Sequence, residues 1–188
     1  MVPSMEQPWY QQLFSPTARA NLETTKAKAD RGDADAQFGL GFKYANCDGE
    51  ARDYAQAAQW YLKAADQSHS LAQFNLAVMY AKGQGEPKDE AKALIWFRKA
   101  ALQGDPGAQF NLGMREHRAS STGPIEDALE SRIEAYKWYH LAAAQGYHGS
   151  ASALEIVNLS MTENQVADGN RRAADFLAAS AKRSEHHD

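Results

Sequence analysis

The chain has 188 residues, of which 44% are hydrophobic and 10% aromatic, a composition that excludes disorder throughout and suits one domain or one elongated array. Its formal charge is −4, with 20 Lys and Arg against 24 Asp and Glu, so no global positive field can hold nucleic acid or an anionic membrane. Cys47 is the only cysteine, which excludes an intrachain disulfide framework and fits a reducing compartment. Residues 1–14 contain no basic segment followed by an apolar run, and no stretch approaches the ~20 apolar residues that span a bilayer. We therefore expect a soluble, cytoplasmic protein that binds neither nucleic acid nor membrane.

The first expected element is a helix that begins at Ser15-Pro16, because Pro is favoured at the first helical position. The residues that follow, ARANLETTKAKADRG, look like half a repeat unit. We assign residues 1–31 to an N-terminal segment with this capping half-repeat helix.

One ten-residue phrase then occurs three times. It reads GDADAQFGLG from Gly32, SHSLAQFNLA from Ser68 and GDPGAQFNLG from Gly104, so successive copies lie 36 residues apart. A second phrase follows each copy and reads AAQWYLKAA, ALIWFRKAA and AYKWYHLAA. Its tryptophans are Trp60, Trp96 and Trp138. The last interval is 42 residues, so the third unit carries a six-residue insertion, which we expect in its connecting loop.

Both phrases predict helices. In the first, Ala72, Leu76 and Tyr80 fall at i, i+4 and i+8 and form one apolar stripe. In the second, the i, i+3, i+4, i+7, i+8 pattern is occupied by Ala93, Trp96, Phe97, Ala100 and Ala101. Since neither helix can bury its stripe alone, each pair should fold into a hairpin, and adjacent hairpins should stack. We predict that the three tryptophans pack in the interior.

The Gly83-Gln84-Gly85 turn raises the question of a phosphate cradle. Such a cradle needs a preceding strand and a following Lys-Ser/Thr pair or third glycine, and this stretch has neither. We predict a bend, in which Gly83 ends one helix in the left-handed conformation and Asp89 lies near the start of the next. Asp53 holds the equivalent place in the first unit, and Cys47 replaces Gly83 there.

The recurring pattern is Ala-Gln-Phe-x-Leu-Gly, then Tyr-x-x-Gly-x-Gly-x-x-x-Asp, then Ala-x-x-Trp-Phe/Tyr-x-Lys-Ala-Ala. It resembles the Sel-one-like repeats (SLR), α/α-hairpin relatives of the tetratricopeptide repeats. The resemblance implies an all-α fold, a right-handed α/α solenoid of stacked helical hairpins. It also implies an adaptor or scaffold for protein complexes rather than an enzyme.

On this scheme the chain divides into successive units after the N-terminal segment. These are repeat 1 at 32–67, repeat 2 at 68–103, repeat 3 at 104–145, an incomplete fourth repeat with a C-terminal capping helix at 146–180, and a polar tail at 181–188. The capping helix should begin with a capping box of Thr162 and Gln165 and a hydrophobic staple between Met161 and Val166. We expect it to end near Ala178.

Residues that carry chemistry are scattered through the sequence. The six histidines show no metal-ligand spacing, and no Gly-x-Ser-x-Gly nucleophile elbow is present. Cys47 stands at a turn position and is interpreted as a loop thiol rather than a nucleophile. We therefore predict no catalytic residue, no cofactor and no metal site.

The expected binding surface is the concave face of the array, which the first helix of each hairpin lines. The stripe of these helices that points away from Leu76 includes Met79 and defines the candidate groove residues. They are Phe42, Asn46, Asn75, Val78, Lys82, Asn111, Met114 and Arg118. In this hypothesis the asparagines bond a partner's backbone, the apolar side chains make contact, and the two cations hold a carboxylate. The alternative is an ordinary solvated helix face.

Other functions stay open at this point. The partner could instead bind the inserted region between Met114 and Asp127, where Glu116 replaces the tyrosine of the other units. An enzyme or small-molecule binder is a second possibility, but the paired cysteines of the β-lactam-binding members are absent here. A structural array that self-associates through its ends is a third. The sequence does not identify the partner, the oligomeric state, or whether Met1 or Met5 is the native start.

Overall fold

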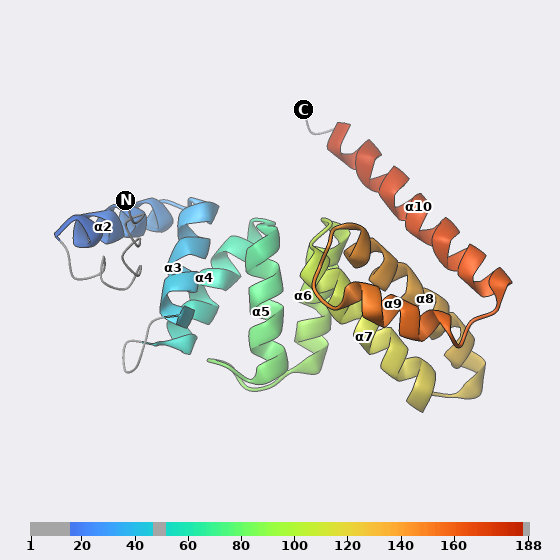
Figure 1. The fold of residues 1–188 in the computed structure, drawn as a ribbon. Helices are drawn as coiled ribbons and strands as arrows, with labels where there is room; N and C mark the ends of the chain where they lie inside the picture. Colours follow the sequence, from blue (N-terminus) through green and yellow to red (C-terminus); the bar gives the residue numbers. More distant parts are fainter. Residues whose placement is uncertain (1–15, 47–51, 186–188) are drawn as a thin grey trace, which may run out of the picture. The chain divides into compact units, whose positions relative to one another are not determined.

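The computed structural model describes residues 16–46 and 52–185. Within these residues the chain forms nine α-helices and no strand, which confirms the predicted all-α class (Figure 1). The chain divides into two compact units, Met1–Glu90 and Ala91–Asp188. None of the helices in the described ranges is long and apolar enough to cross a membrane. Cys47 and its turn lie outside the described residues.

The first unit contains four helices. These are α2 (Pro16–Asp30), α3 (Ala34–Asn46), α4 (Tyr54–Asp66) and α5 (Ser70–Lys82). α2 begins at the predicted proline and packs on α3, α3 and α4 form a hairpin, and α4 packs on α5 (Figure 1).

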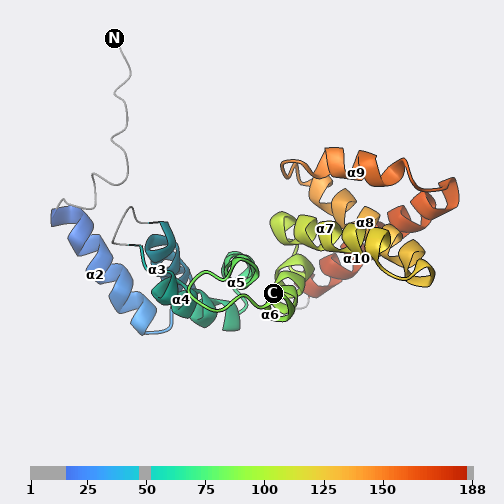
Figure 2. The ribbon, with the colours of Figure 1, turned by 90° about the horizontal axis from the view of Figure 1, so that it is seen from below.

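The second unit contains five helices, the first of which is α6. Its helices are α6 (Glu90–Leu102), α7 (Pro106–Thr122), α8 (Ile125–Ala144), α9 (Ser150–Asn158) and α10 (Glu163–Glu185). α7 and α8 form a hairpin, and both α9 and α10 pack on α8 (Figure 2).

The first helix of each hairpin is capped from one repeat position. Asp33 and Asp105 each accept, through Oδ1, the backbone N–H three residues on, at 2.8 Å and 2.7 Å. His69 holds this position in the middle repeat, where its Nδ1 accepts the equivalent N–H at 3.2 Å. A side-chain acceptor at this place satisfies an N–H that has no partner within the helix.

The glycine turn after α5 is a bend, as predicted. Gly83 is left-handed, with φ 69°, and its N–H donates to the carbonyl four residues earlier. Gly85 has φ 77°, and a Cβ atom there would lie 2.2 Å from the carbonyl oxygen of Tyr54, so only glycine fits. Asp89 immediately precedes α6, near whose N-terminus a carboxylate is favoured.

The core follows the predicted stripes with one exception. Ala72, Leu76 and Tyr80 are all buried. Trp60 is also buried, but Trp96 and Trp138 are half-buried, so the prediction that all three tryptophans are interior is wrong for two of them. The aromatic residue that follows each tryptophan is the one buried in every repeat. These are Tyr61, Phe97 and Tyr139.

A lysine ammonium group lies over the ring of each repeat tryptophan, whether that tryptophan is buried or half-buried. The Nζ atoms of Lys63, Lys99 and Lys137 lie 3.9, 4.0 and 4.2 Å from the ring centroids of Trp60, Trp96 and Trp138. A cation over an indole face is an attractive contact, and it recurs three residues after each repeat tryptophan or one residue before it.

Glycines let the buried tyrosines approach the first helices closely. A Cβ atom at Gly41 would lie 2.6 Å from Cδ1 of Tyr61, and one at Gly113 would lie 2.6 Å from Cδ1 of Tyr139. Such distances are too short for two carbon atoms, so the ring lies in space that any larger residue would fill.

Buried glutamines join the first helix of each of the three repeats to the helix before it. Gln37, Gln73 and Gln109 each donate, through Nε2, to the backbone carbonyl eight residues earlier, at 3.0, 3.0 and 3.4 Å. Gln67 and Gln145, which follow α4 and α8, donate in turn to Oε1 of Gln37 and Gln109 at 2.8 and 2.9 Å. Helix ends and the next hairpin are thus connected by side-chain amides.

The insertion in the third repeat lengthens helices rather than a loop. α7 has 17 residues and α8 has 20, against 13 in α5 and α6, and only Gly123 and Pro124 connect them. The expected longer loop is therefore wrong. The inserted residues contain no helix breaker before Gly123, and hydroxyl groups bond carbonyls of the preceding turn, as in Ser120 to His117 at 2.7 Å and Thr122 to Arg118 at 2.9 Å.

The C-terminal helix begins as predicted and runs further. The Thr162 N–H donates to Oε1 of Gln165 at 2.9 Å, and the Gln165 N–H donates to Oγ1 of Thr162 at 3.4 Å, which is a capping box. Met161 and Val166 pack on the same core cluster. α10 continues to Glu185 instead of ending near Ala178, because no Gly or Pro follows that could stop it.

Replacing Ser68 by glycine should stabilise the protein. Among the described residues other than glycine, Ser68 alone has a positive φ, 67°, whereas Gly32, Gly104 and Gly146 hold its position elsewhere. The left-handed conformation strains a residue with a Cβ by ~1–2 kcal/mol, partly offset by the greater freedom of glycine in the unfolded chain. We expect Ser68→Gly to raise the free energy of unfolding by ~0.5–1 kcal/mol in urea titrations. Ser152→Gly, in the middle of α9, should lower it, and a loss of stability in both variants would contradict the assignment.

Two glycine-to-alanine changes should act in opposite directions. Gly113→Ala should destabilise by ~1–3 kcal/mol, because its new methyl group would overlap the Tyr139 ring. Gly39→Ala, in α3 with nothing within 4 Å of its Cβ position, should stabilise by up to ~1 kcal/mol through helix propensity. Chemical denaturation followed by circular dichroism compares the two. Equal stabilisation by both changes would show that the Tyr139 ring can make room for a methyl group at position 113, contrary to this prediction.

Candidate protein-interaction surface

Five of the predicted groove residues lie in the first unit, on two helices in contact, α3 and α5. They are Phe42, Asn46, Asn75, Val78 and Lys82. The Phe42 side chain is 53% exposed, a large value for an aromatic residue. Asn46 and Lys82 are exposed, and Asn75 and Val78 are half-buried.

The other three predicted residues lie on α7 in the second unit. Met114 is 45% exposed, Arg118 is exposed and Asn111 is half-buried. Met79, expected on the same stripe, is only 4% exposed and lies in the core. It follows Leu76 by three residues, which places both on the buried side of α5.

Each groove asparagine is bonded to its own helix. The Nδ2 atoms of Asn46, Asn75 and Asn111 donate to the carbonyl oxygen four residues earlier, at 2.8, 2.9 and 2.8 Å. This bond orients the side chain along the helix surface and uses one N–H. The amide oxygen, an acceptor, lies outside the bond, so a partner's N–H is the group these side chains suit best.

A fourth apolar residue occupies the repeat position that Phe42, Val78 and Met114 hold in the other repeats. Ile156 of α9 is 59% exposed and stands 42 residues after Met114, the same interval that separates the last two repeat tryptophans. Within the three complete repeats, Phe42, Val78 and Met114 follow one another at intervals of 36 residues. We call Phe42, Val78, Met114 and Ile156 the apolar row. Sequence reasoning missed Ile156, although the match between GDPGAQFNLGM and GYHGSASALEI at this offset carried the signal.

Other exposed apolar positions do not recur in this way. Four of them have a polar residue in an equivalent place, as the pairs Leu62 with Arg98, Leu71 with Asp35, Ile95 with Gln59, and Leu102 with Asp66 show. The apolar row is therefore apolar in all four repeats, whereas these neighbouring positions vary.

Shifted pKa values in the repeats have structural causes. Burial raises the pKa of the Tyr139 hydroxyl to about 12 and also raises that of Tyr61. Burial likewise raises the pKa of Asp105, which caps α7. In the described ranges, no three His, Cys, Asp or Glu side chains are grouped so as to hold a metal ion.

A cluster of charged side chains holds α10 on α8. The Arg172 guanidinium pairs with Glu134 at 2.9 Å and with Asp168 at 3.0 Å, and it also pairs with Glu130. Arg171 pairs with Asp168 as well. These pairs tie one arginine of α10 to two carboxylates of α8, so they define how the last helix docks.

Apolar contacts complete the docking of α10. A Cβ atom at Gly169 would lie 2.5 Å from the Tyr136 ring, and the Tyr136 hydroxyl lies 3.2 Å from Oδ1 of Asn170. Trp138 meets Phe176 edge to face, with ring centroids 5.5 Å apart. Gly169 in the middle of a helix is thus explained by the ring that it accommodates.

Helical hairpins with a recurring core, together with an exposed row at one repeat position, define an α-helical repeat protein. The chain matches the family model of the Sel1 repeat over residues 34–69, 70–105 and 106–147. It therefore belongs to the Sel1 repeat family, and the predicted resemblance is confirmed.

Two solved structures extend the comparison. A Sel1 repeat protein from Oxalobacter formigenes is 37% identical, with a TM-score of 0.59, over 72% of this chain and 97% of that one. A protective antigen from uropathogenic Escherichia coli strains, which displays an SLR fold, is 24% identical with a TM-score of 0.52. That match covers 87% of this chain and 43% of the antigen, and it supports the solenoid fold alone. No curated protein matches the chain.

Acid should loosen α10. The hydrogen bond from Arg172 lowers the pKa of Glu130 below its ordinary 4.5, and the bond from Arg171 lowers that of Asp168 below 3.8. Groups with depressed folded pKa values stabilise above their unfolded values and lose this effect as pH falls. We expect amide protection in α10 to decrease as pH drops from about 4.5 through the depressed values.

Hydrogen exchange with mass spectrometry, corrected for intrinsic rates, measures this between pH 6 and 3. In an Arg172→Gln variant, α10 should already exchange faster at pH 6 and show little further loss in acid. Unchanged protection of α10 in the wild type at low pH would contradict a docking role for the cluster.

Proposed function

We propose that this protein is a non-catalytic adaptor that binds a peptide or helix of a partner protein through the apolar row and the polar residues beside it. The observation that carries the proposal is the recurrence of an exposed or half-buried apolar side chain at one position in four repeats. Three of these side chains, Phe42, Met114 and Ile156, are about half exposed. Leaving such groups in water is unfavourable, and their burial against a partner would remove that cost.

The polar neighbours suit a peptide ligand. Four residues after Val78 and Met114 stand Lys82 and Arg118, which are exposed cations on the same helix face. The asparagine oxygens offer acceptors for backbone N–H groups, as described above. An apolar strip flanked by acceptors and cations fits an amphipathic segment that carries Asp or Glu.

Family membership supports the same class of function. Sel1 repeat proteins are generally protein-interaction scaffolds, and stacked hairpins line a concave face with their first helices. The apolar row lies on α3, α5, α7 and α9, each of which is the first helix of its repeat. The cytoplasmic location stays a prediction, since the sequence features behind it do not distinguish one aqueous compartment from another.

Paired serine substitutions test the surface. A partner captured from a lysate of the source organism is purified, and its affinity is measured by calorimetry for Phe42→Ser/Val78→Ser and for Met114→Ser/Ile156→Ser. We expect each pair to weaken binding at least tenfold, because apolar anchors contribute ~1–2 kcal/mol each. The matched control is Leu71→Ser/Leu102→Ser, which removes exposed leucines outside the row.

The control variant should bind like the wild type. If it loses as much affinity as the two row variants, general surface apolarity rather than the row determines binding. If the row variants bind normally while circular dichroism shows intact helices, the partner uses another surface and the proposal is wrong.

A further inference from the structure

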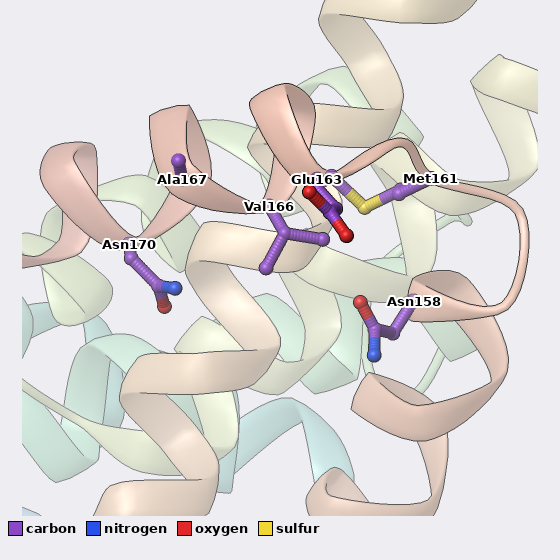
Figure 3. Close-up of a pocket in the computed structure, with 6 residues that line it drawn as sticks. All are labelled: Asn158, Met161, Glu163, Val166, Ala167 and Asn170. Atoms are coloured by element: carbon purple, nitrogen blue, oxygen red, sulfur yellow. The ribbon is translucent and has the colours of Figure 1, made fainter.

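A shallow depression lies between the end of α9 and the start of α10, and none of the residues that line it belongs to the apolar row. Its volume is about 470 Å³, and its lining residues are Asn158, Met161, Glu163, Val166, Ala167 and Asn170 (Figure 3). Figure 3 shows the two asparagines on opposite sides, with Val166 and Glu163 between them. None of these residues was singled out as a binding residue from the sequence.

The apolar part of the depression is held rigidly. Met161 and Val166 are half-buried and pack on the core cluster that contains Tyr136, Tyr139 and Val157. The capping box at Thr162 fixes the first turn of α10 directly beside them. A preformed apolar surface of this kind can accept the methylene groups of a long side chain without rearrangement.

The polar groups at the rim point to a peptide. The Asn170 Oδ1 atom accepts the Tyr136 hydroxyl at 3.2 Å, so its NH₂ group is left to donate to a carbonyl oxygen. Asn158, on the other side, is exposed and makes no side-chain hydrogen bond to the described residues. Two amides that face one depression match the alternating donors and acceptors of an extended backbone.

The charge of the region selects a cation. The Glu163 carboxylate is exposed and has no ion pair among the described residues. From Trp138 to Asn170 the chain contains Glu155, Glu163 and Asp168 but no Lys or Arg. Asp168 pairs with Arg171 and Arg172, which leaves Glu155 and Glu163 without an ion pair among the described residues.

The nearest arginines already have partners. Arg132 donates to the carbonyl oxygen of Ser160 at 3.0 Å, and Arg171 and Arg172 pair with carboxylates of α8 and α10. They are thus engaged in holding the α9–α10 connection and α10 in place, and Glu163 is left for an external group.

We propose that this depression is a second docking site, which takes the side chain of an Arg or Lys in an extended segment of a partner protein. The cation pairs with Glu163, the methylene groups lie on Met161 and Val166, and the adjoining backbone bonds Asn158 and Asn170. The apolar row suits an acidic amphipathic segment, so the two sites differ in the charge that they select.

Titration of the ¹⁵N-labelled full chain with two peptides tests the site. The probes are acetyl-Ala-Arg-Ala-amide and the same peptide with citrulline, which keeps the shape of arginine and removes its charge. We expect the arginine peptide to shift the amide resonances of Asn158, Glu163, Val166 and Ala167. The affinity of the citrulline peptide should be at least about fivefold lower. Binding of the arginine peptide should also weaken with added salt.

Three variants locate the interaction. Glu163→Gln should lower the affinity for the arginine peptide by the same factor of about five. Glu23→Gln, which neutralises an exposed helix carboxylate in the first unit, should leave it unchanged. Ala167→Leu keeps the charge but fills part of the depression, and it should also weaken binding. Circular dichroism confirms that α10 is retained in each variant.

Several results would overturn the proposal. Equal binding of the citrulline peptide, equal effects of Glu163→Gln and Glu23→Gln, or shifts scattered over the surface would each show that no specific cation site exists. Sedimentation of the free protein supplies a further test: if Glu163→Gln abolishes a dimer of the wild type, the depression is an interface with a second copy. Because the Met114→Ser/Ile156→Ser variant should bind the arginine peptide normally, failure here is distinguishable from failure of the apolar row.

Discussion

Buried glutamine amides hold the hairpins of this chain in register. Gln37, Gln73 and Gln109 satisfy carbonyl groups at the end of the preceding helix, and Gln67 and Gln145 extend two of these bonds to the following helix end. A buried carbonyl without a partner costs ~1–3 kcal/mol, so helix ends could not be packed inside an array without such donors. α3, α5 and α7 are thereby anchored at their N-terminal ends.

Close contacts then set how near the helices lie. Tyr61 and Tyr139 lie against glycines of the first helices, and Tyr136 lies against Gly169 of the last helix in the same manner. The equivalents of Tyr136 in the other repeats are Ala58 and Leu94, which shows that this tyrosine belongs to the docking of α10 rather than to the repeat itself. A helix docked in this way closes the end of the core, and its first turn forms the depression beside α9.

The two proposed sites follow from this construction in different ways. The apolar row is a property of the repeat, since one outward position stays apolar while its neighbours vary. The depression is a property of the end of the array, where α9 is only nine residues long and the repeat pattern stops. Opposite preferences for charge would let one chain hold two different segments, a useful property for a scaffold.

The sequence by itself determined the repeat, its helices, and the residues that end or begin several of them. The 36-residue spacing, the Gly83 turn and the Thr162 capping box depend on short-range chemistry, which acts between residues a few positions apart. Helical periodicity also placed the candidate groove residues at exposed or half-buried positions, because it separates opposite faces of a helix. It does not separate adjacent positions: the apolar stripe included both Trp96 and Phe97, and only the structure showed that Phe97 is the more deeply buried of the two rings.

Tertiary structure decided the features that depend on distant segments. The insertion after Met114 became helix because two long helices, α7 and α8, pack on each other along their length. Gly169 is a weak helix former, but α10 needs glycine there because the ring of Tyr136, 33 residues earlier, occupies the space of a Cβ atom. Likewise, the depression is lined by residues from the end of α9 to Asn170 of α10, and Asn170 accepts a hydrogen bond from a hydroxyl group of α8. Packing between segments far apart in the chain has no local signal, which is why the sequence determined the elements and the fold decided which surfaces they form.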